Sequence, residues 1–202
     1  SSHAFEVLQA GTQTTVQDYP GRLGYWDVGV PPSGPMDALS FRMANRIVGN
    51  ADGEAALEIT VLGPTLRFRS RAVVAVTGAP FAVTLNDAPA PMWTPVEVPA
   101  GGTLKIGACG GAGLRCYLAV RGGLDVPEYL GSKSTFILGK FGGAAGRILQ
   151  SGDVLHWTDC AISEPAAAAV LPEITRAWTI GVLYGPHGAP DYFTARDIDT
   201  FF

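Results

Sequence analysis

Short apolar runs separated by glycine and proline are the feature that most limits the fold of this chain. Its 202 residues include 26 Gly and 15 Pro, and these recur between runs rich in Val, Ile, Thr and aromatic residues. Runs bounded by turn residues are typical of β-strands, and many in succession indicate a closed barrel or a sandwich. We therefore predict a mainly β chain, with strands at residues 5–9, 56–62, 65–69, 72–77, 81–85, 103–108, 114–121, 148–157 and 178–184.

The densest group of basic residues, Arg67, Arg69 and Arg71, alternates with apolar residues that include Leu66 and Phe68. This period of two predicts a half-buried strand whose arginines face water. The other basic residues are scattered, and the formal net charge is −4. Phosphate contacts need clustered Lys and Arg, so nucleic acid is not an expected partner.

One segment has the period of a helix. Ser33 or Asp37 is suited to cap its start, and Gly49 with Asn50 is suited to end it. Between them, apolar residues recur every three or four positions: Met36, Leu39, Met43, Ala44, Ile47 and Val48. This pattern predicts an amphipathic helix packed on a β core.

The segment leading into this helix, residues 14–37, has an unusual composition for a connecting loop. It holds four glycines and four prolines together with carboxylates, one Arg and several hydroxyls. Because Gly and Pro free or fix the backbone at chosen points, we expect an ordered but irregular path. Such a path can display the polar groups of a small-molecule site, although a plain ordered turn with buried caps is the other interpretation.

Composition also bears on the compartment. No apolar run approaches the ~20 residues needed to cross a bilayer, so no membrane association is expected. The first residues lack the basic start and apolar stretch of a secretion signal. Cys109, Cys116 and Cys160 form no CxxC pair, which favours reduced thiols and a cytoplasmic location.

A change of pattern at residues 161–174, rich in alanine with two prolines, predicts a linker. It divides a first domain at 5–160 from the start of a second at 175–202. In the second part, Thr194 and Asp197 resemble a helix capping box. Phe201 and Phe202 close the sequence with aromatics that so short a stretch cannot bury, so we expect this second domain to be truncated here or completed by another polypeptide.

Spacing argues against several kinds of chemistry. His3, His156 and His187 are far apart and lack metal-site spacing, so no metal is expected. The glycine-dense stretch 139–147 matches neither a phosphate-binding loop nor a dinucleotide fingerprint, and Ser132 is not in a G-x-S-x-G elbow. What remains is a site of backbone N–H groups, hydroxyls, Arg and a carboxylate. Such a set suits a small planar polar molecule and negative charge on oxygen.

Six motifs occur in order: Thr14–Asp18, Gly29–Asp37, Ala56–Glu58, Ala119–Pro127, Leu130–Thr135 and Gly142–Arg147. Over essentially its whole length, the chain resembles the biotin-dependent carboxyltransferase family, also called allophanate hydrolase subunit 2. That family includes the carboxyltransferase domain of urea carboxylase and a subunit of bacterial 5-oxoprolinase. The Pro-Pro-Ser-Gly-Pro form at 31–35 and the stretch 185–194 look most like the urea carboxylase branch.

The resemblance implies a cyclophilin-like β-barrel, the start of a second barrel, and one or two short helices. It implies transfer of the carboxyl group from carboxybiotin to the nitrogen of urea, forming allophanate. Biotin would sit on a separate carrier domain, and ATP with Mg would be used by a separate biotin carboxylase domain. The implied partners are these two domains, a second homologous carboxyltransferase part, and further copies in a homo-oligomer. The chain alone is therefore expected to be inactive.

Within that family, the predicted helix N-terminus is a natural place for an oxyanion, because it presents unpaired N–H groups and a partial positive charge. The expected catalytic residues are Arg22, Ser33, Gly34, Asp37 and Arg121. The expected substrate-binding or orienting residues are Asp18, Glu58, Thr77, Gly78, Ser132, Ser134 and Thr135.

Each of these residues also has a purely structural interpretation. Asp37 can simply cap the helix, and Arg121 can brace the turn at residues 122–123. The hydroxyls at 132–135 can satisfy their own backbone. Glu58 points either to solvent or to an inward partner, and the inward arrangement needs a pairing group because a buried charge is costly.

Three other functions compete with urea carboxylation. The same chemistry on guanidine would require a carboxylate for a cationic substrate. A 5-oxoprolinase subunit would share the family but act on 5-oxoproline. A regulatory or binding module would keep the fold without catalysis.

Overall fold

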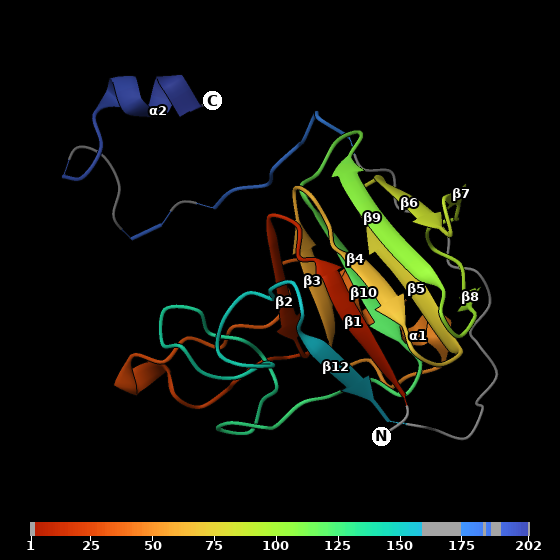
Figure 1. Cartoon of the computed structure of the whole chain (residues 1–202). Coiled ribbons are helices and arrows are strands. Elements are labelled where there is room, and N and C mark those ends of the chain that lie inside the picture. The colour runs from red at the N-terminus through yellow and green to blue at the C-terminus, as the bar shows by residue number, and fades with distance from the viewer. Residues whose placement is uncertain (1–2, 159–174, 184, 187–190, 202) are drawn as a thin grey trace.

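The computed structural model describes residues 3–158, 175–183, 185–186 and 191–201. Its first sheet has seven strands in the spatial order β11 (Leu124–Asp125), β12 (Val154–Trp157), β1 (Ala4–Gln9), β4 (Thr65–Phe68), β9 (Thr103–Cys109), β6 (Phe81–Leu85) and β7 (Ala88–Pro89). Its second sheet has five strands in the order β2 (Gln13–Gln17), β3 (Ala56–Thr60), β10 (Arg115–Val120), β5 (Ala72–Gly78) and β8 (Val96–Val98). The two sheets lie against each other, and α1 (Ala38–Val48) lies beside the second (Figure 1).

This architecture confirms the mainly β fold with one or two short helices. The helices of the described residues are α1, α2 (Ala195–Phe201) and the short 3₁₀ helix η1 (Trp26–Val28). Closure of the strands into a barrel stays a prediction. Within the described part of the chain, no helix is long and apolar enough to cross a membrane.

The five-stranded sheet buries both of its faces, and each face packs on a different partner. Leu57 and Ile59 of β3 belong to the main core between the sheets. Ala56 faces the opposite way and belongs, with Tyr117 and Ala119, to a second cluster under α1. Because side chains alternate along a strand, Glu58 shares the α1 face with Ala56, and so does the last residue of β3, Thr60.

The expected strand at 65–69 is confirmed. Leu66 and Phe68 are fully buried, whereas Arg67 and Arg69 are exposed. The strand expected over 148–157 is shorter, because only Val154–Trp157 forms a strand, which pairs with β1.

Helix α1 begins and ends where its capping residues indicate. Asp37 is the N-cap and accepts a hydrogen bond from the Ser40 backbone N–H. Gly49 ends the helix with a φ of 84°. The expected apolar stripe is wrong at its start: Met36 and Leu39 are 76% and 59% exposed. The helix rests instead on the following residues, which recur at helical spacing: Phe41, Ala44, Ile47 and Val48.

Strand β2 is not among the expected strands, because Gln13–Gln17 opens the Gly- and Pro-rich segment. The strand expected at 178–184 is wrong for residues 178–183, which form no strand. Trp178, Ile180 and Leu183 are exposed there, and an extended segment needs a hydrogen-bonded neighbour to become a strand. Residue 184 lies outside the described residues.

The expected linker at 161–174 also lies outside the described residues, so the domain division stays a prediction. The capping box before α2 is confirmed in outline. Thr194 N–H donates to the Asp197 carboxylate at 2.8 Å, and Asp197 N–H donates back to the Thr194 hydroxyl at 3.2 Å.

Candidate functional site

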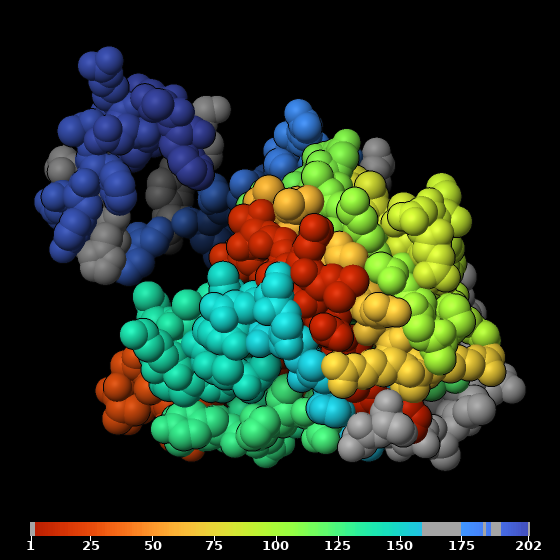
Figure 2. All heavy atoms as spheres, in the orientation of Figure 1, coloured from red at the N-terminus to blue at the C-terminus, as the bar shows by residue number. Residues whose placement is uncertain are grey.

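Two long loops meet beside the edge of the five-stranded sheet that ends with β2. The first runs from residue 18 to 37 and carries η1; the second runs from 126 to 150. In Figure 2 the η1 segment and the later loop, coloured orange and green to teal, form one continuous lobe. The first loop is irregular but fixed, since Arg22 N–H donates to the Pro32 carbonyl at 2.6 Å and Tyr19 N–H donates to the Gly53 carbonyl.

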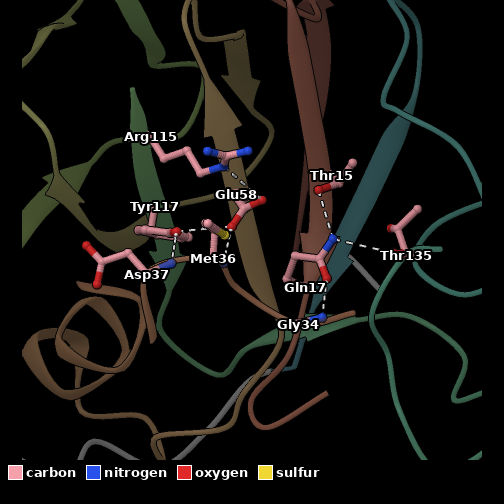
Figure 3. A network of polar contacts seen from close by, with 9 residues as sticks. All are labelled: Thr15, Gln17, Gly34, Met36, Asp37, Glu58, Arg115, Tyr117 and Thr135. Carbon is pink, nitrogen blue, oxygen red and sulfur yellow. Dashed lines mark hydrogen bonds and ion pairs between the residues drawn. The ribbon is translucent and has the colours of Figure 1, made fainter. Parts of the chain in front are cut away.

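The amides at the end of the first loop already have acceptors (Figure 3). Gly34 N–H donates to Gln17 Oε1 at 3.0 Å. Met36 N–H donates to Glu58 Oε2 at 2.7 Å, and Asp37 N–H donates to the Tyr117 hydroxyl at 2.8 Å. The expectation that Gly34 and Asp37 offer unpaired N–H groups to an oxyanion is therefore wrong.

Ser33 and Asp37 have backbone and capping roles in this turn. Ser33 adopts a positive φ of 56°, which reverses the chain just before Gly34. The Asp37 carboxylate accepts hydrogen bonds from both the N–H and the hydroxyl of Ser40. The capping interpretation of Asp37 is thus confirmed, and Ser33 is not the N-cap.

Glu58 is turned inward and has the partners that burial demands. It is 8% exposed and accepts hydrogen bonds from Met36 N–H and the Tyr117 hydroxyl, the latter at 3.0 Å. Arg115 Nε lies 3.6 Å from its other oxygen, forming an ion pair. Burial, followed by the charge of Glu58, raises the pKa of Tyr117, so the phenol remains protonated and donates.

Gln17 connects the two loops to β2. Its Oε1 holds Gly34, while its Nε2 donates to Thr15 Oγ1 at 3.0 Å and reaches the Thr135 carbonyl at 3.5 Å. Thr135 in turn donates through its hydroxyl to the Val16 carbonyl at 2.9 Å. These side chains form the right-hand half of the network in Figure 3.

Asp18 organises the second loop. Its carboxylate accepts from the hydroxyls of Ser132 and Ser134 at 2.6 and 2.5 Å and from the Lys133 N–H at 2.8 Å. Both serines are fully buried. The structure therefore brings together the three residues at positions 18, 132 and 134, in an arrangement that orients backbone.

Arg22 is a fully buried cation between the loops. Its guanidinium donates to the carbonyls of Tyr129 and Ser134 at 3.0 and 2.9 Å and lies 4.9 Å from the ring centroid of Phe141. Burial lowers the pKa of the Arg22 guanidinium, and the nearby Asp18 charge partly offsets this. A guanidinium is not deprotonated in proteins, so the group stays charged and locks the second loop onto the first.

Of the other expected residues, Thr77 lies opposite Tyr117 in the β5–β10 register, whereas Arg121 lies away from this network. Thr77 Oγ1 donates to the Ser40 carbonyl at 2.7 Å, and Gly78 ends β5 with a φ of 97°. Arg121 Nε donates to the Val48 carbonyl at the other end of α1, where a cation complements the helix dipole. An 11-residue helix is about 16 Å long, so Arg121 is not brought to the Asp37 end.

Sequence reasoning missed Gln17, Tyr117 and Arg115. Only its place in a family motif marks Gln17 in the sequence. A general signal was that a polar side chain at the end of a buried strand needs hydrogen-bond partners. Tyr117 alternates correctly with apolar neighbours on β10, and its hydroxyl was the signal that a polar partner must lie nearby. Among the described residues, no three His, Cys, Asp or Glu side chains gather into a group that could hold a metal ion.

The comparisons with known proteins agree on one family. A family model described as "Carboxyltransferase domain, subdomain A and B" matches residues 28–202. The urea amidolyase of Lachancea kluyveri is 50% identical over 98% of this chain, which is 12% of that protein. A 5-oxoprolinase subunit of Haemophilus influenzae is 37% identical over 75% of this chain and 48% of that protein.

A solved structure extends the likeness to three dimensions. The crystal structure of the Kluyveromyces lactis urea carboxylase matches with a TM-score of 0.90 and 50% identity over 98% of this chain. The matched part is 19% of that chain. The present chain therefore spans a minor part of these larger proteins and about half of the bacterial relative.

Proposed function

The chain belongs to the carboxyltransferase domain family, and we propose that it forms part of a biotin-dependent carboxylase that transfers a carboxyl group to a nitrogen of urea, giving allophanate. The observation that carries this proposal is the match to the K. lactis urea carboxylase, which covers 98% of this chain at 50% identity and a TM-score of 0.90. The fold is shared and half of the aligned residues are identical, so a shared reaction is the simplest inference.

The chain's own residues supply a rigid frame for this reaction. Glu58 and Gln17 hold the turn before α1, while Asp18 and Arg22 hold the second loop against the first. Substrate-positioning groups must be held within a fraction of an ångström for efficient transfer. Buried hydrogen bonds to charged groups provide such fixation, because each is stronger than its neutral counterpart.

Biotin is the cofactor that the family implies, and when bound it supplies the ring nitrogen that carries the transferable carboxyl group. The donors expected to meet its ring oxygen do not fit this task. Arg22 is fully buried between the loops, and the N–H groups of Gly34 and Asp37 already have acceptors. We therefore assign the biotin contacts to no residue of this chain and propose that a second homologous part of the carboxyltransferase supplies them.

Membership of this family also suggests which other domains the chain works with. We propose that the biotin carrier and the biotin carboxylase, which uses ATP and Mg, belong to other domains of the same enzyme, and that the 202-residue chain alone does not catalyse the transfer. Assembly into a homo-oligomer belongs to the same proposal. The free thiols of Cys109 and Cys116 support a cytoplasmic setting, where cysteines remain reduced.

The test is substrate-dependent turnover by the complete carboxylase that contains this chain. We expect urea to stimulate ATP hydrolysis and fixation of labelled bicarbonate, with guanidine and 5-oxoproline giving little stimulation. If guanidine or 5-oxoproline stimulates these activities and urea does not, that compound replaces urea as the proposed substrate. If none of the three compounds stimulates them, a regulatory or binding module is favoured.

The 5-oxoprolinase alternative has one specific observation behind it, the 37% identity to the H. influenzae 5-oxoprolinase subunit. That match covers 75% of this chain, whereas the urea amidolyase match covers 98%. Of these two relatives, only the urea amidolyase matches the remaining residues, which favours urea.

A further inference from the structure

Large apolar side chains are exposed on the lobe that residues 18–37 and 126–150 form. The exposed members are Leu23, Trp26, Val28, Tyr129, Ile137 and Leu138, which we call the lobe patch. Trp26 is 72% exposed and Leu138 is 88% exposed. Single exposed apolar residues are common on protein surfaces, but soluble proteins rarely expose many of them together. The lobe patch therefore indicates an interaction surface.

Buried contacts join the two loops beneath the patch. Arg22, which precedes the first member of the patch, donates to the Tyr129 carbonyl and lies over the Phe141 ring. Tyr129 packs on the same ring, with the ring centroids 4.9 Å apart. Phe136 pairs with Phe141 across the turn that carries the last two members of the patch. The two loops thus present their apolar side chains from one lobe, which is continuous in Figure 2.

The η1 end of the patch is held in its exposed position by hydrogen bonds. The N–H groups of Val28 and Val30 both donate to the Tyr25 carbonyl, and Gly29 N–H donates to the Trp26 carbonyl. A partner that binds a turn fixed in this way loses little conformational entropy. Tryptophan is also among the residues that contribute most to protein–protein binding. Trp26 is therefore suited to anchor a protein partner.

The charge of the two segments limits the chemistry of that partner. Residues 23–28 and 129–138 contain one charged residue each, Asp27 and Lys133. Nucleic acid requires clustered cations, which these segments lack. The centres of protein–protein interfaces are depleted in charged residues and enriched in aromatic ones. The patch consequently fits an apolar protein surface.

Two observations place such a surface in the same enzyme. The match to the K. lactis urea carboxylase covers 98% of this chain but 19% of that chain, so most of that relative lies outside the matched part. The lobe also carries the candidate site, where Arg22 is buried and the N–H groups of Gly34 and Asp37 already have acceptors. A neighbour that supplies the biotin contacts has to lie against this lobe.

The apolar character of the patch selects a permanent neighbour. A biotin carrier has to leave after each transfer, and permanent interfaces are more hydrophobic than transient ones. We propose that the lobe patch is the docking surface for the second homologous part of the carboxyltransferase, with Trp26 as its main anchor. This inference rests on the proposed function for the existence of that part.

A photo-crosslinker in the complete carboxylase tests which partner covers the patch. p-Benzoylphenylalanine replaces Trp26, and mass spectrometry identifies the cross-linked peptides. We expect links to peptides of the second homologous part. Links to the biotin carrier, to the biotin carboxylase or to a second copy of residues 1–202 would overturn the docking surface, and so would the absence of links.

The matched control places the same crosslinker at Leu114. This side chain is also exposed, but it precedes Arg115, which pairs with Thr60 at the end of β3 opposite the lobe. Residue 17, where the first loop begins, pairs with Ala56 at the other end of β3. We expect no links from position 114 to the second homologous part, and the same links from both positions would overturn the docking surface.

Hydroxyl-radical footprinting of the native complete carboxylase requires no substitution. We expect Trp26, Tyr129 and Leu138 to be protected from oxidation, although all three are exposed in this chain. Trp26→Ser should raise the oxidation of Tyr129 and Leu138 by up to about tenfold, the effect of losing one interface anchor. Leu114→Ser should leave it unchanged. Oxidation of the three native side chains at the rates of exposed residues would overturn the docking surface.

Urea-dependent turnover of the native enzyme separates this inference from the proposed function. Turnover with urea, together with cross-links from position 26 to another partner, would overturn the docking surface and keep the proposed function. Cross-links to the second homologous part without turnover on urea would overturn the proposed function and keep the docking surface.

Discussion

Removing one hydroxyl, in Tyr117→Phe, tests whether the sheet holds the turn before α1. The Tyr117 hydroxyl accepts from Asp37 N–H at 2.8 Å and donates to Glu58 Oε2 at 3.0 Å. A neutral hydrogen bond contributes about 0.5–1.5 kcal/mol and one to a charged group about 1.5–3 kcal/mol. Glu58 keeps its bond from Met36 N–H, so we expect a loss of about 3 kcal/mol in the free energy of unfolding.

Thermal unfolding by calorimetry or circular dichroism measures this loss. For a domain of this size, 1 kcal/mol shifts the midpoint by about 2–4 °C, so Tyr117→Phe should lower it by about 6–12 °C. The matched control is Tyr129→Phe, which keeps the ring contact with Phe141 and the backbone carbonyl that Arg22 uses. An unchanged midpoint in Tyr117→Phe would refute the reasoning.

Hydrogen exchange gives the local counterpart of that measurement. Without its acceptor, the Asp37 amide should exchange faster in Tyr117→Phe, whereas the Gly34 amide, held by Gln17, should be less affected. A double-mutant cycle with Glu58→Gln should show coupling of about 1–2 kcal/mol, because the two groups are in direct contact. Full additivity would mean that the contact contributes nothing.

Three further substitutions test other parts of the frame. Arg22→Met should lower the free energy of unfolding by about 2–4 kcal/mol and make the second loop sensitive to protease, and an unchanged cleavage rate would contradict the lock. Arg46 lowers the pKa of Asp52 to about 2, so Asp52→Asn should be less stable than the native chain at neutral pH. This difference in stability, measured from denaturant midpoints, should disappear as the pH falls from about 4 towards 2. A difference that persists at about pH 2 would disprove the linkage. Gly142→Ala should lower the free energy of unfolding by about 2 kcal/mol or more, because φ is +73° and a Cβ would collide with the backbone of residue 134. Gly29→Ala should lower it by about half as much or less, because φ is +80° but nothing lies within 4 Å of the added Cβ. Equal unfolding midpoints for the two variants would contradict this difference.

The sequence was sufficient for those parts of the fold that depend on local pattern. Alternation at Leu66 and Phe68 predicted β4, and Asp37 and Gly49 marked the ends of α1. Strand β2 is absent from the predicted strands because its residues run directly into a segment rich in glycine and proline, which is typical of a loop. The run Thr14–Val16 is β-branched throughout, and that signal alone would have identified the strand.

The candidate site could be predicted only in part, because its partners are set by strand register. Residue type and position offered Asp37 as a cap, and they left Glu58 either facing solvent or turned inward to a partner. Tyr117 could not be chosen as that partner, since the two residues are 59 apart in sequence and meet only through the β3–β10 pairing. The same pairing places Arg115 beside Thr60, which no spacing along the chain reveals.

The occupied amides change how the helix N-terminus must be understood. An oxyanion could use Met36 or Asp37 N–H only by displacing Glu58 or Tyr117, and it would leave a buried carboxylate without its donor. Breaking a hydrogen bond to a buried charge costs about 1.5–3 kcal/mol before any gain from the new contact. A turn built in this way is more useful as a fixed wall than as an anion receptor.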